Sequence, residues 1–550
     1  MEILRRLRNR RALTAVFAIA LAVTLVGIAP GTAAAAAFKG VLTFHNDNAR
    51  DGVNSRETVL TPGNVNSQQF GKVFSYPVDG YVYAQPLYVP RVKIPKNGVH
   101  NVVYVATEHD SVYAFDADGL VSAPLWQRSF IDPANGVTTV PSPADTGATD
   151  IIPEVGITGT PVIKTAGGTL YVVATTKVVN AQTQAVTYEQ QLHALALATG
   201  AEKLGGPVLI NPLMPGTGDG SSGGVIPFNA LRQTQRPGLL LSKGVIYIAF
   251  ASQGDVSPYH GLVMAYGAAQ LGQFAVFDDT PNGGDGGIWQ SGNGPAADAQ
   301  GRIYVASGNG TFDFDQGGLD LGDSIIELGF SRLSGFKVKT YFKPYDQALF
   351  ASTDDDFGDS GVLLLPNQTS GRVHLAVTAG KDGVIYLVNR HAMGGYNPSN
   401  NDQIVQALSG ALSGGVWAVP AFINNTMYLG ANGDFLKGFT LSSGQFPSTA
   451  NLATAVAFAY PGTSPSISAN GSRNVIVWAL KNEGYASGSP TVLYAFDSNL
   501  NELYDTTQAP ANRDQAGAAV KFTVPTVANG RVYVGTQTEL DVYGLLPSGG

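Results

Sequence analysis

The sequence predicts an all-β protein: an eight-bladed β-propeller of four-stranded antiparallel blades, preceded by a signal peptide. Three observations predict this fold: eight copies of one strand pattern, 67 glycines in 550 residues, and no long helical periodicity after residue 37. Glycine makes up about 12% of the chain, against a usual ~7%. This excess indicates many tight turns and therefore many short strands.

The first segment, residues 1–37, has the layout of a secretory signal peptide. Five arginines precede an apolar run over residues 12–29, and the small residues 32–37 offer cleavage sites of the A-x-A type. An uncleaved membrane anchor is the alternative, because ~18 apolar residues stand at the low edge of a spanning length. The cleavage sites favour removal. We therefore expect an exported protein, periplasmic or extracellular, with no membrane insertion after the signal is removed.

The remaining residues, 38–550, are expected to form a single propeller whose N-terminal segment completes the ring. Each repeat has a short apolar strand, a strand of the Y-V-A-T type and a strand ending in a turn like A-F-D. A sheet this small cannot bury both faces alone, so the sheets must stack around an axis. An open β-solenoid is the alternative, but its repeats would be shorter and more regular. The copies occupy residues 85–116, 160–195, 236–266, 294–328, 360–389, 419–439, 464–497 and 524–545.

Composition excludes several classes of function. The chain has 33 basic and 41 acidic residues, a net charge of −8 and few basic clusters, which argues against nucleic acid as a partner. It has no cysteine, which excludes a disulfide scaffold, a thiol nucleophile and a c-type haem site. Its 7 histidines show no spacing typical of a zinc site.

In its motifs the chain resembles the quinoprotein alcohol dehydrogenases and the wider family of pyrroloquinoline-quinone-like propellers. Residues 60–66 (LTPGNVN) before 70–74 (FGKVF) resemble the segment that leads into the first blade of that family. Residues 114–119 (AFDADG), followed by Trp126, resemble its blade-docking motif A-x-D-x-x-x-G…W. In that motif the tryptophan packs between neighbouring blades, so Trp126 is expected to be structural. The resemblance spans nearly all of the chain after the signal peptide and implies bound pyrroloquinoline quinone and Ca²⁺.

A local resemblance concerns residues 286–290 (GGIWQ) and 303–310 (IYVASGNG). It implies that Trp289 stacks on the planar quinone and that Asn309 offers its amide oxygen to Ca²⁺. An aromatic face suits a flat ligand, and calcium binds amide and carboxylate oxygens. The alternative is that Trp289 belongs to the core and that Asn309 holds a left-handed turn between glycines. Trp289 stands two residues further from its Asn than in the family.

Residues 380–390 (GKDGVIYLVNR) resemble the family's strand pair K/R-x-G-x-x-Y-x-L-D-R. The resemblance implies that Lys381 approaches the quinone oxygens, where a cation polarises a carbonyl or pairs with a carboxylate. Trp417 is assigned with Trp289 and Lys381 to the residues that seat the cofactor. The alternative for Lys381 is an exposed position in an ordinary D-G hairpin.

The acidic tract over residues 354–359 lies where the family has its catalytic base. Asp354 and Asp356 are therefore assigned as candidate catalytic residues. Alternation along a strand would point both to one side and Asp355 away. A carboxylate beside other charges can acquire a pKa suited to base catalysis. A solvated loop is the alternative.

Two departures from the family bear on this chemistry. The vicinal cysteine pair that caps the quinone cannot exist here, since the chain has no cysteine. The calcium-ligating Glu after the second blade's Y-V-V-A strand is replaced by Thr176 and Lys177. Glu189 is the nearest carboxylate that could compensate, so it is assigned with Asn309 as a candidate metal ligand.

Two hypotheses follow. In the first, the protein is an exported quinone-dependent oxidoreductase acting on an alcohol, sugar or polyol. In the second, the propeller is a non-catalytic binding or scaffold module for a glycan, a small ligand or an envelope protein. Fold alone cannot decide between them, because propellers host many functions. The missing cysteine pair and the missing Glu favour the binding module, whereas Trp289, Asn309 and Lys381 favour the oxidoreductase, which is the hypothesis we adopt.

Overall fold

The computed structural model describes residues 38–368 and 373–547. The predicted signal peptide and its predicted cleavage sites lie outside the described residues. Among the residues described, no helix is both long enough and apolar enough to cross a membrane.

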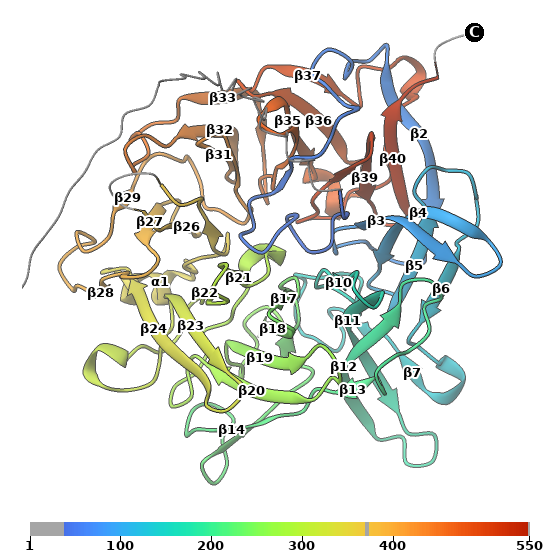
Figure 1. Ribbon diagram of the computed structural model, residues 1–550. Coiled ribbons are helices and arrows are strands. Elements are labelled where there is room, and N and C mark those ends of the chain that lie inside the picture. The colour runs from blue at the N-terminus through green and yellow to red at the C-terminus, as the bar shows by residue number, and fades with distance from the viewer. Residues whose placement is uncertain (1–37, 369–372, 548–550) are drawn as a thin grey trace, which may run out of the picture. The chain divides into compact units, whose positions relative to one another are not determined.

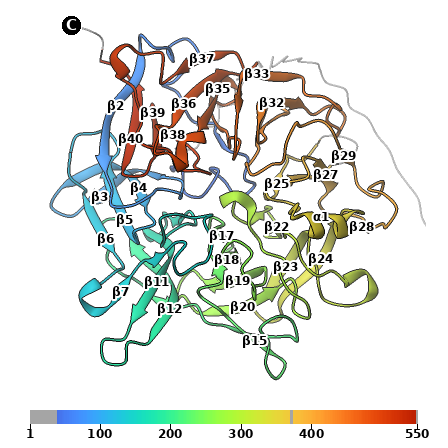
Figure 2. The ribbon, with the colours of Figure 1, turned by 180° about the vertical axis from the view of Figure 1, so that it is seen from behind.

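Eight sheets, one for each sequence repeat, follow one another around a central axis (Figures 1 and 2). The prediction of an eight-bladed propeller of mainly four-stranded antiparallel blades is therefore confirmed. The first four blades contain β3 (Leu87–Ile94), β4 (Gly98–Ala106), β5 (Ser111–Asp116), β6 (Trp126–Ser129); β10 (Val162–Lys164), β11 (Thr169–Val179), β12 (Val186–Ala196), β13 (Val208–Leu209) with β7 (Val137–Thr138); β16 (Gln233–Thr234), β17 (Leu240–Ser242), β18 (Val245–Ser252), β19 (Leu262–Gly267), β20 (Gln273–Asp278); and β21 (Ala296–Ala297), β22 (Ile303–Ala306), β23 (Ile325–Ser331), β24 (Gly335–Lys343) with β28 (Gly395–Tyr396).

The last four blades are built in the same way. They contain β25 (Leu363–Leu364), β26 (Leu375–Ala379), β27 (Ile385–Asn389), β29 (Gln406–Leu408); β30 (Ala421–Ile423), β31 (Thr426–Gly430), β32 (Asp434–Thr440), β33 (Leu452–Phe458); β34 (Ser466–Asn470), β35 (Arg473–Lys481), β36 (Val492–Asp497), β37 (Glu502–Asp505) with β1 (Val53–Asn54); and β38 (Thr526–Ala528), β39 (Arg531–Gly535), β40 (Glu539–Leu545), β2 (Phe70–Pro77).

Short elements fill the connections between blades. They are the ribbons β8 (Val140–Pro141) with β9 (Glu154–Val155) and β14 (Leu213–Pro215) with β15 (Val225–Pro227), the helix α1 (Gln347–Thr353), and the 3-10 turns η1 (Pro133–Asn135), η2 (Gln290–Gly292), η3 (Phe314–Gln316), η4 (Glu483–Ala486) and η5 (Pro510–Asn512).

The ring closes between the two ends of the chain. Strand β2 pairs antiparallel with β40, from Phe70 opposite Leu545 to Pro77 opposite Glu539, and supplies the outermost strand of the eighth blade. Figure 1 shows this blue strand beside the red strands of the last blade. The pairing places the first long strand of the chain and the last one in the same sheet.

A second N-terminal feature, which we call the central thread (residues 41–54), runs along the inner strands. It exchanges a hydrogen bond with the inner edge of every blade, in chain order from the first to the eighth. Its partners are Tyr88, Ile163, Leu239, Ala297, Leu364, Phe422, Ile467 and Val527. Arg50 anchors the thread: its side chain is fully buried and donates to Pro295 O at 2.8 Å and Phe44 O at 2.8 Å.

Apolar cores lie between successive blades. The core between the seventh and eighth blades surrounds the fully buried Trp478, which contacts Phe70 at 5.5 Å between ring centroids. Trp126 joins the first blade to the second, since its Nε1 donates to Leu197 O at 2.9 Å. Trp126 is therefore structural, as its motif predicts.

The antiparallel order of the strands gives the ring two faces. In each blade the innermost strand begins at the face where the second strand turns into the third; we call this face A. The hairpins from first to second strand, and from third to fourth, lie at the other face, which we call face B. This division places the candidate site on face A.

Candidate functional site

A pocket of about 280 Å³ lies on face A, where the connections leading into seven of the eight blades converge. We call it the central pocket. Five of its lining side chains are carboxylates, two are basic and four are aromatic. The lining residues are Asp150, Arg236, Gly254, Asp255, Trp289, Asp354, Asp356, Asp359, Lys381, Trp417, Tyr460 and Phe522. Of the seven site residues predicted from the sequence, Trp289, Asp354, Asp356, Lys381 and Trp417 therefore meet here.

Lys381 is the centre of the polar side of the pocket. It lies in the turn between β26 and β27, and its Nζ lies 2.6 Å from Asp356 Oδ2 and 3.1 Å from Asp354 Oδ1. Only 13% of the Lys381 side chain and 5% of the Asp356 side chain are exposed, against 70% for Asp354. The alternative of an exposed hairpin lysine is therefore wrong. Of the two carboxylates that contact Lys381, Asp354 is the one that solvent and ligands can reach.

Burial and charge act in opposite directions on these groups. Burial raises the pKa of Asp356, and the ammonium group of Lys381 partly offsets this rise. Asp359 has no cation so close, and its pKa is raised well above the usual range by burial and by the neighbouring Asp356. For Lys381, burial lowers the pKa, but the carboxylates of Asp356 and Asp359 together outweigh burial and raise it. Lys381 is consequently a permanent cation and donor at neutral pH.

The acidic tract does not form the strand expected from the sequence. Residues Gln347–Thr353 form helix α1, which ends at Asp354 in the left-handed conformation (φ 58°). The chain then turns, so that Asp356 accepts a hydrogen bond from the Asn309 main-chain N at 2.8 Å. A Cβ on Gly308 would lie 2.5 Å from Asp356 Oδ1, so this contact needs glycine there. The two carboxylates converge on Lys381 through a helix end and a turn, without strand alternation.

Aromatic rings form the other side of the pocket. Trp417 packs edge-on against Tyr460 at 5.3 Å between centroids, and Tyr460 packs in the same way against Phe522 at 6.2 Å. The guanidinium of Arg236 lies 4.1 Å from the Phe522 ring centroid and 5.6 Å from that of Trp289. Burial raises the pKa of Tyr460 to about 12, so its hydroxyl stays protonated. The pocket thus offers flat apolar surfaces beside a second cation.

Three polar atoms around the pocket are buried without a hydrogen-bond partner among the described residues. They are Trp289 Nε1, Arg236 Nη2 and Asn309 Oδ1. Buried polar groups are nearly always paired, so unpaired atoms next to a cavity indicate a missing ligand or water. Asn309 lies between Gly308 and Gly310 but does not adopt a left-handed conformation, so the alternative that it holds a left-handed turn is wrong. Its amide instead donates to Asp354 Oδ1 at 3.3 Å and leaves Oδ1 unpaired.

Glu189 does not reach the central pocket. It lies on β12 opposite Thr176 of β11, and its carboxylate accepts a hydrogen bond from Gln191 Nε2 at 2.8 Å. It lines a separate pocket of about 200 Å³ with Phe130 and His193. Lys177 is also engaged elsewhere, with its Nζ 2.6 Å from Asp145 Oδ2. The assignment of Glu189 beside Asn309 therefore fails: the strand holds its side chain against other residues.

Among the described parts of the chain, no group of three or more His, Asp or Glu side chains is arranged to hold a metal ion. Two candidate oxygen ligands lie beside the central pocket: Asn309 Oδ1, which has no partner among the described residues, and the exposed carboxylate of Asp354, which faces the Nδ2 side of that amide. These are the ligand types that Ca²⁺ takes.

Sequence reasoning missed Arg236, Asp255, Tyr460 and Phe522. Burial raises the pKa of Asp255 to about 6, with a further contribution from Asp356. Arg236 could have been found from the sequence, because it stands at the start of the third repeat, where the other seven copies have uncharged residues. Tyr460 and Phe522 could not have been found in this way, because they lie in connections between blades that differ in length and share no sequence pattern.

Comparison with known proteins finds solved structures with a similar fold but no match in sequence. No family model matches the chain, and no curated protein matches it. Its structure is similar to quinohemoprotein alcohol dehydrogenase ADHIIG from Pseudomonas putida HK5, with a TM-score of 0.58 and 13% identity over 92% of this chain and 80% of that one. It is also similar to quinohemoprotein alcohol dehydrogenase from Comamonas testosteroni, with a TM-score of 0.55 and 15% identity over 93% and 82%. At such identity the likeness shows a shared propeller fold.

Proposed function

We propose that the chain is an exported quinoprotein-like oxidoreductase that oxidises an alcohol, sugar or polyol with bound pyrroloquinoline quinone and Ca²⁺. The observation that carries the proposal is the set of unpartnered atoms at the central pocket: two donors, Trp289 Nε1 and Arg236 Nη2, and one acceptor, Asn309 Oδ1. A planar ligand with carboxylate and carbonyl oxygens would use the donors, and a hard cation would use the acceptor.

The remaining lining residues suit the same ligand. The faces of Trp289 and Trp417 would pack on its rings, and Lys381 and Arg236 would balance its carboxylates. Asn309 would supply its unpaired amide oxygen to the cation. When bound, the quinone supplies the two-electron acceptor for the C–H bond of the substrate.

The two candidate catalytic carboxylates have different surroundings. Asp356 is buried and already bound to Lys381 Nζ and to the Asn309 main chain. Asp354 is 70% exposed at the mouth of the pocket. We therefore assign Asp354 as the general base that takes the hydroxyl proton of the substrate. Asp356 is a positioning residue that fixes Lys381.

A binding module is the second candidate, favoured by the absence of cysteine and by the position of Glu189 in another pocket. Its occupants would be a glycan, a small ligand or an envelope protein rather than nucleic acid. In that case the central pocket would bind a planar anion without redox chemistry.

The test is titration of metal-stripped protein with pyrroloquinoline quinone, with and without Ca²⁺, followed by tryptophan fluorescence and thermal unfolding. Saturable binding should raise the melting temperature by mass action. It should weaken in Trp289→Phe and Lys381→Met. The matched control is Lys437→Met, which removes a part-buried lysine 2.7 Å from Asp434 in the sixth blade. Binding followed by dye-linked oxidation of alcohols or sugars supports the enzyme. Binding without turnover supports the module, and no binding refutes the quinone site.

A further inference from the structure

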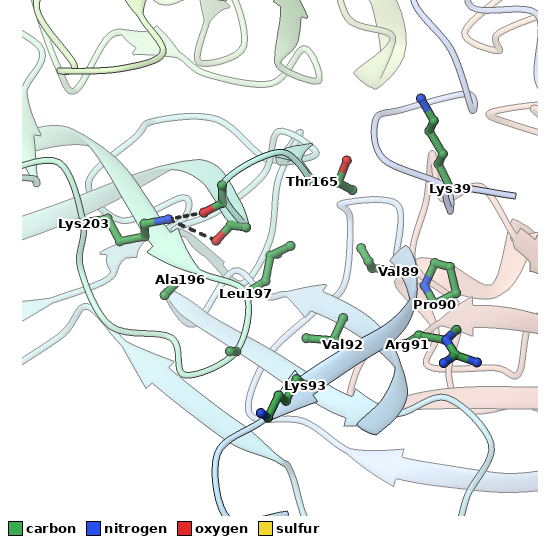
Figure 3. A pocket seen from close by; sticks show the side chains of 13 residues that line it. Lys39, Val89, Pro90, Arg91, Val92, Lys93, Thr165, Ala196, Leu197 and Lys203 are labelled. Atoms are coloured by element: carbon green, nitrogen blue, oxygen red, sulfur yellow. Dashed lines mark hydrogen bonds between the residues drawn. The ribbon is translucent and has the colours of Figure 1, made fainter. Parts of the chain in front are cut away.

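A larger cavity, of about 650 Å³, lies between the first and second blades. We call it the basic pocket. Four basic side chains stand around a group of small aliphatic ones (Figure 3). The residues lining it are Lys39, Val89, Pro90, Arg91, Val92, Lys93, Thr165, Gly167, Gly168, Ala196, Leu197, Ala198 and Lys203. None is acidic, although acidic residues outnumber basic ones in the chain by 41 to 33.

The basic pocket opens away from the central pocket. Gly167 and Gly168 form the turn from β10 to β11, and Ala198 and Lys203 belong to the connection from β12 to β13. Both connections lie at face B, whereas the central pocket lies at face A. A ligand of the basic pocket therefore has no contact with Lys381 or Trp289. The two cavities are separate sites.

The charges of the basic pocket are not neutralised within the protein. The side chains of Lys39, Arg91 and Lys93 are exposed and form no hydrogen bond or ion pair with any described residue. Lys203 donates only to uncharged groups: the main-chain oxygens of Gly167 and Gly168 and, at 2.8 Å, Thr169 Oγ1. Four positive charges around one cavity repel each other, and an anion in the cavity relieves that repulsion.

The backbone is distorted where it presents these charges. The pairing of β3 with β4 shifts register between Val89 and Val92, which leaves Pro90 and Arg91 in a bulge. Arg91 has a φ of 57°, a left-handed conformation that is unfavourable for a residue other than glycine. Bulges re-aim side chains and occur often beside functional sites. Here the bulge sets Arg91 and Lys93 beside the cavity.

Between the charges the surface is aliphatic and rigid. Val89 and Leu197 are 6% and 5% exposed. The main-chain oxygen of Leu197 accepts hydrogen bonds from Trp126 Nε1 and Tyr104 Oη, both at 2.9 Å. No aromatic side chain lines the cavity, so it offers no platform for stacking a base or a sugar ring.

From this combination we propose that the basic pocket binds an amphiphilic anion: an aliphatic chain that ends in a carboxylate or a phosphate group. The acidic head would lie at Arg91 and Lys93, while Lys203, whose three donors are used within the protein, adds only its positive charge. The chain would lie on Val89, Val92 and Leu197. Burial of the methylene groups stabilises such a complex, and the charges select the anion over the neutral alcohol of equal length.

The experiment is calorimetric titration of the full chain with decanoate and decyl phosphate. Decanol serves as the probe that has the aliphatic chain without the charge, and inorganic phosphate as the probe that has the charge without the chain. We expect saturable binding at one site for the two amphiphiles and much weaker binding for the other two. Arg91→Gln with Lys93→Gln should weaken decanoate binding about tenfold, because two charge-assisted contacts are lost. The matched control is Lys337→Gln with Lys339→Gln, two exposed lysines at the same spacing on β24. It changes the net charge equally and should leave the affinity unchanged.

Each other outcome overturns the proposal. Equal weakening in both double variants means general attraction by net charge. Equal affinity for inorganic phosphate means a simple anion site, and equal affinity for decanol means an apolar groove. The same titration with Trp289→Phe, which alters only the central pocket, should match the unmodified protein. This control separates the basic pocket from the proposed oxidoreductase site.

Discussion

The Nζ of Lys381 lies 2.6 Å from Oδ2 of Asp356, and both side chains are almost completely buried on face A. A pair of this kind is held by mutual attraction against the cost of removing both charges from water. Its two members are therefore expected to be much less tolerant of single substitutions than of a joint one.

Lys381→Met is expected to lower the free energy of unfolding by about 3 kcal/mol or more, because Asp356 is left buried without its cation. Adding Asp356→Asn should restore much of the loss. Urea unfolding of the two single variants and the double variant measures the coupling. Additive losses would mean that the pair contributes no interaction of its own.

Asp354→Asn is expected to leave the melting temperature unchanged, because the side chain is 70% exposed. Under the proposed function it should lower kcat by roughly 10²–10⁴-fold, the usual contribution of a general base. Quinone affinity, measured by fluorescence, should change far less than kcat. A full-rate Asp354→Asn enzyme would remove this residue from the mechanism.

Glu108 and Asp110 predict a pH dependence of stability. Both are fully buried, and Glu108 Oε1 and both Asp110 carboxylate oxygens lack a hydrogen-bond partner among the described residues. Burial raises the pKa of Glu108 to about 8 from an ordinary 4.5. The folded state therefore binds a proton that the unfolded state releases. The stabilisation from this proton is complete below about pH 4.5 and is lost as the pH rises toward 8.

Unfolding free energies measured between pH 5 and pH 8 should consequently fall less steeply in Glu108→Gln than in the unmodified protein. The largest slope that one group can contribute is about 1.4 kcal/mol per pH unit. Asp402→Asn, at an exposed position, serves as the control and should retain the original slope. Parallel profiles for all three proteins would show that Glu108 is ionised in the folded state.

Arg50→Met is expected to destabilise the protein by about 3 kcal/mol or more, because the oxygens of Pro295 and Phe44 lose their donor inside the protein. Arg56→Met is the control on the same segment, since Arg56 is exposed. Thermal unfolding compares them. Equal melting temperatures would show that the central thread contributes little to stability.

The fold could be predicted in detail because each repeat carries its own strand and turn pattern, and the eight copies correspond to the eight blades. The site could be predicted only where a residue belongs to a strand motif. Lys381 follows a recognisable strand, and Trp289 and Asn309 flank another. Asp354 and Asp356 line the central pocket although residues 354–356 form the end of helix α1 and a turn instead of the expected strand.

Glu189 shows why the rest could not be predicted. Glu189 is close in sequence to Thr176, where the family has its calcium-ligating Glu. On strand β12, however, the Glu189 side chain points into a different cavity, away from Asn309. Tyr460 and Phe522 reach the central pocket from connections with no pattern shared among blades. Their positions depend on how the blades close around the axis, which no local sequence pattern specifies.

The central thread has a consequence for the order of assembly. Residues 41–54 are made early, yet their last partner, Val527, is made almost at the end, as is the β40 partner of β2. The contacts of the central thread and the closure of the ring can therefore be completed only when synthesis is nearly finished. Contacts this distant in sequence slow folding. Under the proposed export, a nascent chain that stays open until its final blade is made could still be threaded through a secretion pore.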